Sequence, residues 1–249
     1  MATICLFGDV NNAAPLLLSF ADHHAIVLVD PDGESVEQGR VRVVGSVDDV
    51  EATFDVIVDA GCDADYLFVD AERLCPGGII LVNGVDETAT QGAASLGEEM
   101  ASRARVLAFS FLPGLFPSSS VIEVSIATQI PLVDHASLLE RVGSLFRDRK
   151  VEHVEDRLGL VSARVLAMIL NEAAFAVMEG VATSDDIDTA MRLGTSYPTG
   201  PLAWCDAIGA GWVVHLLDGL YEEYRDERYR ACVLLRQMAR AGGQFHTTT

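Results

Sequence analysis

The 249-residue sequence predicts an α/β region followed by an all-α region. Short apolar segments rich in β-branched residues alternate with brief helical stretches in the first part, which is typical of a mostly parallel sheet covered on both faces. From about Asp134 the apolar residues recur with the period of a helix. We therefore expect two domains, residues 1–155 and 156–249, each large enough for a core of its own.

The expected strands are short, and most are bounded by glycine, proline or acidic residues. A helix-like segment, Ala14–Phe20, follows the first of them, and a turn at Pro76-Gly77-Gly78 precedes the fifth. In chain order the predicted strands are Thr3–Phe7, Ala25–Val29, Val41–Val44, Asp55–Asp59, Ile79–Val82, Val106–Phe111 and Val121–Ile126.

Two short helices are expected between residues 183 and 211. Thr183 and Asp186 have capping-box spacing at the start of the first, and Gly194 is suited to end it. Pro201 favours the first position of the second helix, which we expect Gly209 and Gly211 to end.

The other predicted helices differ in how apolar they are. Leu138–Leu145 has one apolar side, whereas Arg164–Glu179 is apolar almost all round, as expected of a buried helix or a subunit interface. Trp212–Tyr224 and Tyr229–Arg240 are amphipathic, and the tail Gly242–Thr249 has no periodicity and is expected to fray.

Composition and charge exclude several classes of partner. The formal net charge is −20, which disfavours binding to nucleic acid or to anionic membrane surfaces. No apolar run predicts a membrane span, and the first residues do not resemble a signal peptide. The five cysteines are scattered and odd in number, which favours reduced thiols in a cytoplasmic protein. An anionic ligand would need a local basic patch, and Arg164, Arg192 and the arginines of 225–240 either form one or lie on solvated helix faces.

The turn after the first strand resembles part of a dinucleotide-binding fingerprint. Gly8 stands at the first glycine of G-x-G-x-x-G and Ala13 at the third, whereas Val10 replaces the second. Asp9 adds a negative charge where a pyrophosphate would lie. Asp30 ends the second strand, where it could accept hydrogen bonds from an adenosine ribose or serve as a turn or cap residue. Weak or absent NAD binding is therefore predicted.

The helical half carries the motifs of a known family. The sequence reads DIDTAMRLG at 186–194, YP at 197–198 and GPLAW at 200–204, followed by ERYR at 227–230 and LLRQ at 234–237. These motifs resemble the C-terminal helical domain of the 3-hydroxyacyl-CoA dehydrogenases, and are most similar to the second, degenerate half of the long bacterial enzymes of phenylacetate degradation.

This resemblance implies a Rossmann-like domain, NAD as cofactor and an acyl-CoA substrate. The first domain is a reduced version, because the interval from Asp30 to Phe54 has room only for a turn, a small helix and one strand. Family members carry a helical hairpin there, which helps to hold CoA.

The resemblance also locates the expected catalytic residues. The family motif H-F-F-N-P, followed by a glutamate on the next strand, matches residues 109–113 and Glu123. Phe109 takes the place of the histidine base and Leu112 that of the asparagine, while Glu123 is retained. The asparagine of G-F-x-x-N-R becomes Ala163, and the family's S-N-T-S-S becomes the sequence at 82–86. A phenylalanine accepts no proton, so little activity is expected from the chain alone.

No other histidine has a clear catalytic setting. His23 and His24 precede the second strand, away from the expected nucleotide, and His215 lies in an apolar helix. Three hypotheses therefore remain open: an active dehydrogenase with a rearranged site, a silent module that dimerises or completes a partner enzyme, and a binding protein for acyl-CoA or another small ligand between the domains. A homodimer formed through the helical domain is expected.

Overall fold

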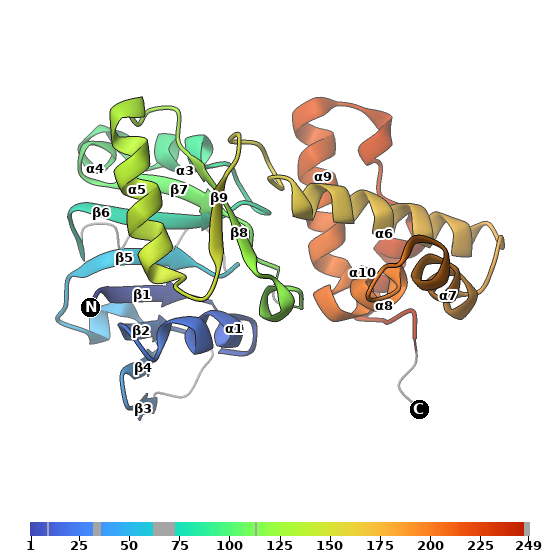
Figure 1. The fold of residues 1–249 in the computed structure, drawn as a ribbon, viewed down its shortest axis with the longest axis horizontal. Coiled ribbons are helices and arrows are strands. Elements are labelled where there is room, and N and C mark those ends of the chain that lie inside the picture. Colours follow the sequence, from blue (N-terminus) through green and yellow to red (C-terminus); the bar gives the residue numbers. More distant parts are fainter. Residues whose placement is uncertain (9, 32–35, 62–72, 113, 247–249) are drawn as a thin grey trace. The chain divides into compact units, whose positions relative to one another are not determined.

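The computed structural model describes residues 1–249 apart from 9, 32–35, 62–72, 113 and 247–249. The chain separates into two compact units (Figure 1). The first comprises 1–113 and 118–160, and the second comprises 114–117 and 161–249. The sequence predicts the division after residue 155, whereas contacts place it at Leu160 and assign the short 114–117 segment to the helical unit.

The first unit is built on a nine-stranded sheet whose order is β3-β4-β2-β1-β5-β6-β7-β8-β9. The six strands from β4 to β7 are parallel, in the doubly wound order of a dinucleotide-binding domain. β3 and β8 each run antiparallel to their neighbours β4 and β7, and β9 is parallel to β8. The strand bounds are β1 Thr3–Phe7, β2 Ala25–Val29, β3 Val36–Gln38, β4 Val41–Val44, β5 Phe54–Asp59, β6 Leu74–Asn83, β7 Arg105–Phe109, β8 Val121–Ile126 and β9 Lys150–His153.

Helices cover both faces of this sheet (Figure 1). On one face, Cys5, Phe7, Val82 and Val106 belong to a buried cluster with residues of α3 (Ala89–Ser95), and Met100 of α4 (Gly97–Arg103) packs against it. On the other face, Phe20 of α1 (Val10–Phe20) packs on Phe146, which follows α5 (Leu132–Leu145), with ring centroids 5.1 Å apart. Two-sided burial explains why the central strands are apolar along their whole length rather than alternating.

The second unit is helical. Its elements are α6 (Ser162–Met178), α7 (Ser184–Thr195), α8 (Pro201–Ile208), α9 (Ala210–Tyr224) and α10 (Val233–Ala241), with a short 3₁₀ turn at Glu227–Tyr229. The core of the unit contains Leu166 and Leu170 of α6, Leu216 and Leu217 of α9 and Leu235 of α10. The predicted α/β region followed by an all-α region is confirmed.

Several local predictions are corrected. The interval between β2 and β5 holds a hairpin of β3 and β4, followed by the 3₁₀ turn Val47–Asp49, rather than a single strand. Gly194 lies within α7, which ends at Ser196 with φ of 60°, and Gly211 lies within α9. Gly209, with φ of 95°, separates α8 from α9 as expected.

Among the described residues, no helix combines the length and the hydrophobicity needed to cross a membrane. Cys5, Cys75, Cys205 and Cys232 are free thiols, and burial raises the pKa of Cys205 to about 12. Cys62 falls outside the described residues.

Candidate functional site

Four polar or small residues end neighbouring parallel strands at one edge of the sheet. Asp30 follows β2, Gly8 follows β1, Asp59 ends β5 and Asn83 ends β6. Because the carboxyl ends of parallel strands share an edge, the topology brings these four positions together. Ligands of doubly wound sheets bind in the crevice outside this edge.

Gly8 is required by the backbone of the first turn. Its φ is +147°, and a Cβ added there would lie 3.1 Å from the Cβ of Ala60. The Gly8 N–H donates to the carbonyl of Val29 at 3.3 Å, which ties the turn to β2. Ala13 is fully buried, so a small residue fits the third position of the fingerprint. Asp9 and the side chain of Val10, on which the prediction of weak NAD binding depends, fall outside what the structure describes.

Asp30 is placed as expected for a ribose contact, at the carboxyl end of β2. It is only 5% exposed, and its N–H donates to the carbonyl of Val44 at 2.9 Å. Its burial and its backbone bond fit both a ribose contact and a turn role.

An acidic cluster at this edge was not anticipated from the sequence. Asp59 is 1% exposed and accepts the Gly61 N–H at 2.8 Å. The turn after β6 brings Asp86 and Glu87 beside it, because both of their N–H groups donate to the Asn83 carbonyl. Burial, the charge of Asp59 and the charge of Asp86 together raise the pKa of Glu87 to about 7. The sequence signal that could have revealed this cluster is the pair of acids, Asp86 and Glu87, that comes soon after β6.

This cluster fits a dinucleotide poorly. Burial, followed by the charges of Asp59 and Asp86, disfavours the ionised form of Glu87, and a pyrophosphate beside them would add two more negative charges. Gly8 and Asp30 fit the turn and the ribose. The carboxylates that flank them do not fit the phosphates.

Phe109 is fully buried in an aromatic group rather than open to a substrate. Its ring lies 5.9 Å from Phe111 and 6.1 Å from Phe146, measured between centroids. In the β7–β8 register Phe109 stands opposite Val124, so Phe109 shares a face of the sheet with Val124. Glu123 is the next residue along β8 and therefore faces the other side. A histidine at 109 would not face Glu123, contrary to the pairing that the motif suggests.

The motif positions Leu112, Ala163 and Asn83 are wholly or partly buried. Ala163 is 1% exposed near the start of α6, and Leu112 is half-buried. Pro113 falls outside the described residues. Asn83 is fully buried, and its Oδ1 accepts the Val85 N–H at 3.2 Å. Its Nδ2 has no hydrogen-bond partner among the described residues.

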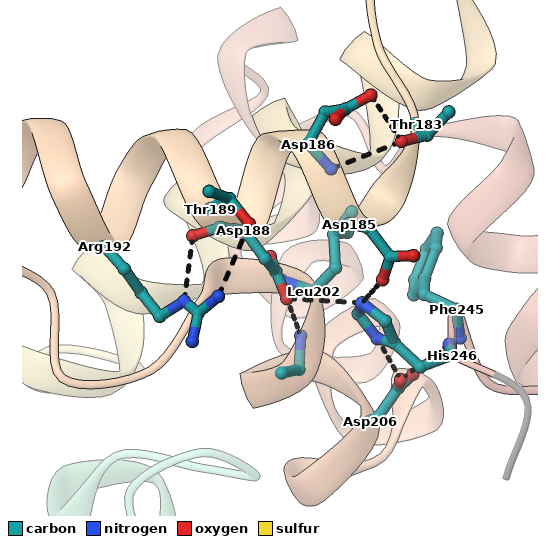
Figure 2. Close-up of polar contacts among 11 residues, drawn as sticks. Thr183, Asp185, Asp186, Asp188, Thr189, Arg192, Leu202, Asp206, Phe245 and His246 are labelled. Atoms are coloured by element: carbon teal, nitrogen blue, oxygen red, sulfur yellow. Dashed lines mark hydrogen bonds and ion pairs between the residues drawn. The ribbon is translucent and has the colours of Figure 1, made fainter.

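The helical unit holds a second polar group, which Figure 2 shows in detail. His246 Nδ1 lies 2.9 Å from Asp206 Oδ2, and Nε2 lies 3.4 Å from Asp188 and 3.5 Å from Asp185. Asp206 also accepts the N–H groups of Phe245 and His246, at 2.7 and 3.0 Å. The expectation that this tail frays is wrong for Phe245 and His246, because both are held by a carboxylate of α8.

Asp188 of α7 connects His246 to the start of α8. It is 5% exposed, and it accepts the N–H groups of Leu202 and Ala203 at the start of α8, at 2.8 and 2.9 Å. A pocket of about 490 Å³ adjoins Asp188 and is lined by Arg192 and His246, among others. Both ring nitrogens of His246 face carboxylates, so the group acts as an anchor for the chain. In the described part of the chain, no set of three or more His, Cys, Asp and Glu side chains is arranged to hold a metal ion.

Comparison with known proteins gives a consistent answer. The family model for the 3-hydroxyacyl-CoA dehydrogenase C-terminal domain matches residues 159–247. The chain is 30% identical to the probable 3-hydroxybutyryl-CoA dehydrogenase of Bacillus subtilis over 210 residues, which cover 82% of this chain and 70% of that protein. It is 50% identical to the 3-hydroxyadipyl-CoA dehydrogenase of Escherichia coli over 91 residues, which cover 36% of this chain but only 19% of the relative.

A solved structure shows the same fold. The (S)-3-hydroxybutyryl-CoA dehydrogenase PaaH1 of Ralstonia eutropha superposes with a TM-score of 0.73 at 24% identity, over 96% of this chain and 94% of that one. A doubly wound sheet followed by a helical unit is thus a fold that this chain shares with that solved structure. The chain belongs to the 3-hydroxyacyl-CoA dehydrogenase family.

Proposed function

We propose that the chain is a 3-hydroxyacyl-CoA dehydrogenase family protein with degenerate nucleotide and catalytic positions. In this proposal it binds an acyl-CoA and dimerises, as an accessory module for a partner enzyme, and catalyses NAD-linked oxidation only weakly by itself. The burial of Phe109 between Phe111 and Phe146 carries this proposal, because the motif expects a histidine base at that position.

The carboxyl edge of the sheet supports the same proposal. Asp59 lies opposite Phe7, next to the Gly8 turn, and Asp86 and Glu87 are close to it. Burial, followed by the charges of Asp59 and Asp86, raises the pKa of Glu87 to about 7. Glu123, the one motif residue able to accept a proton, faces away from Phe109. Weak cofactor binding and slow chemistry therefore have separate physical causes.

The decisive assay is NADH oxidation with acetoacetyl-CoA, run beside a 3-hydroxybutyryl-CoA dehydrogenase of the same family. We expect turnover at least about a hundredfold lower for this chain, since losing a general base removes two to four orders of magnitude. Calorimetric titrations with NADH and with acetoacetyl-CoA separate the two ligands: the CoA ester should bind and NADH should bind weakly. Comparable turnover that disappears in Glu123→Gln would instead make Glu123 the base.

A second function, an active dehydrogenase with a rearranged site, is favoured by Glu87. A carboxyl group with a pKa of about 7 is well matched to accept the proton of a 3-hydroxyl group at neutral pH. This hypothesis requires measurable turnover whose rate rises with pH through about 7 and is lost in Glu87→Gln. Glu123→Gln is its matched control and should leave that turnover intact.

We also propose that the helical unit, within residues 156–249, mediates a homodimer. On and beside α6, Val161, Val165 and Met178 are large apolar side chains exposed by 52, 54 and 42%. A second apolar surface would cover them in a two-fold assembly. The charge of −20 and the free thiols of the four described cysteines are consistent with a cytoplasmic protein that binds neither nucleic acid nor membranes.

A further inference from the structure

A pocket lies at the amino edge of the sheet, opposite the edge described above. Its volume is about 310 Å³. It is lined by His24, just before β2, by Asp55 of β5 and by Ile79 of β6. Arg141 and Ser144 of α5, and Arg147 just beyond the helix, also line it. All of these residues belong to the first unit.

His24 carries a hydrogen-bond donor that the described protein leaves unused. The imidazole is 3% exposed, and its Nδ1 accepts the N–H of Ala2 at 3.2 Å. Because Nδ1 accepts, the proton of the neutral ring is on Nε2. Nε2 is fully enclosed and has no partner among the described residues. Burial, followed by the positive charge of Arg147, lowers the pKa of His24, which keeps the ring neutral and Nε2 a donor.

The two arginines are held by backbone carbonyls rather than by acids. Arg141 Nη1 donates to the carbonyl of Gly77 at 2.9 Å, and Arg147 Nε donates to that of Ser144 at 3.3 Å. Neither forms an ion pair with a described residue. In contrast, Arg225, Arg228, Arg230 and Arg236 of the helical unit are all paired with carboxylates.

One carboxylate does line the pocket, and it is already engaged. Asp55 Oδ2 accepts the N–H of Thr3 at 2.9 Å. The pocket therefore combines two guanidinium groups, one imidazole N–H and one hydrogen-bonded carboxylate, which leaves an excess of positive charge. This excess stands in a chain whose formal charge is −20.

We propose that this pocket binds a phosphate group, either as free phosphate or as the end of a phosphomonoester. Arg141 and Arg147 provide charge-assisted hydrogen bonds to its oxygens, and the Nε2–H of His24 donates to one more once the side chains that enclose it move aside. A phosphate offers several acceptor oxygens to donors that come from different sides, and guanidinium groups match that geometry. The pocket is larger than the group itself, so it also has room for the first atoms of an ester.

The test is calorimetric titration of the full chain with inorganic phosphate, glycerol 3-phosphate and malonate at fixed ionic strength. Saturable binding of one or both phosphate compounds is expected, and the tighter of the two identifies the source. Arg141→Gln and Arg147→Gln should each raise Kd at least about tenfold, the cost of one hydrogen bond to a charged group. Arg141 and Arg147 are both exposed, so replacing either of them should not prevent the chain from folding.

Lys150→Gln is the matched control, because it removes the same charge from an exposed residue outside the pocket. Its Kd should stay within about twofold of the natural chain. His24→Phe should abolish binding, whereas His24→Gln keeps a side-chain donor and should retain part of it. The proposal is overturned by the absence of saturable phosphate binding, by malonate binding as tightly as phosphate, or by equal weakening in Lys150→Gln.

Discussion

Gly200 shows how closely the chain approaches a buried side chain before α8. A Cβ built on Gly200 would lie 2.1 Å from Cγ of Asp188, and that carboxylate cannot withdraw without releasing the Leu202 and Ala203 N–H groups. Gly200→Ala should therefore lower the free energy of unfolding by about 2–3 kcal/mol. Urea denaturation measures this change.

Gly194 is the matched control for that substitution. It lies inside α7, and a Cβ there meets nothing within 4 Å. Gly194→Ala should raise the free energy of unfolding by up to about 1 kcal/mol, because alanine loses less conformational entropy in a helix. An equal effect of the two substitutions would show that the contact with Asp188 is unimportant.

Glu87 should make stability depend on pH in an unusual direction. Its pKa is raised from the ordinary 4.5 to about 7, so the folded state holds a proton that the unfolded state releases. This contribution is complete below about pH 4.5 and is lost as pH rises through about 7. Glu87→Gln should remove the loss, which makes the variant more stable than the natural chain by roughly 1–2 kcal/mol at pH 8 once solvent screening is allowed for. Thermal unfolding from pH 4 to 8 measures the difference, which should be smallest at the acidic end.

At the scale of the element, the register of β7 against β8 decides what a histidine at position 109 can do. Phe109→His places an imidazole among Phe111 and Phe146, on the face of the sheet away from Glu123. We expect a loss of about 3 kcal/mol in unfolding free energy and no gain in NADH oxidation. Phe109→Leu, which keeps the site apolar, should cost less than Phe109→His. A gain in turnover above that of the natural chain would contradict this register.

The elements differ in how well local sequence predicts them. Thr183 and Pro201 were sufficient to locate the starts of α7 and α8, because capping and proline preferences act within a few residues. The end of α7 was wrong, because Ser196 adopts the left-handed conformation that usually favours glycine. β3 and β9 were not predicted at all: each is short, and each forms only by pairing with a strand whose position the local sequence does not reveal.

The candidate site was less predictable than the fold. Gly8 and Asp30 directly follow strands, so the apolar pattern of each strand and the residue at which it ends are enough to locate them. The pKa of Glu87 is raised by its burial and then by Asp59, which is far away along the chain, and no local pattern indicates either. The anchoring of His246 by Asp206 has the same origin, which is why the tail was expected to fray.

At the scale of the whole molecule, the proposed dimer can be tested through α6. Val165 is 54% exposed on this helix, so a charged residue there should disturb an interface more than the fold. The natural chain should have the mass of a dimer by light scattering at micromolar concentration, and Val165→Glu should shift it toward the monomer. Val36→Glu, at a residue 49% exposed in the other unit, is the control and should leave the mass unchanged. A monomeric natural chain would refute the dimer.

The two strands that end the sheet have a consequence for aggregation. β3 has three residues and β9 has four, and β9 carries the ion pair of Lys150 and Glu152. A short strand with charged side chains offers a poor template for a strand from another molecule, because few backbone groups are available and the charges must be desolvated. The long apolar strands lie inside the sheet, between these two. We therefore expect fibril formation only after the sheet itself has opened.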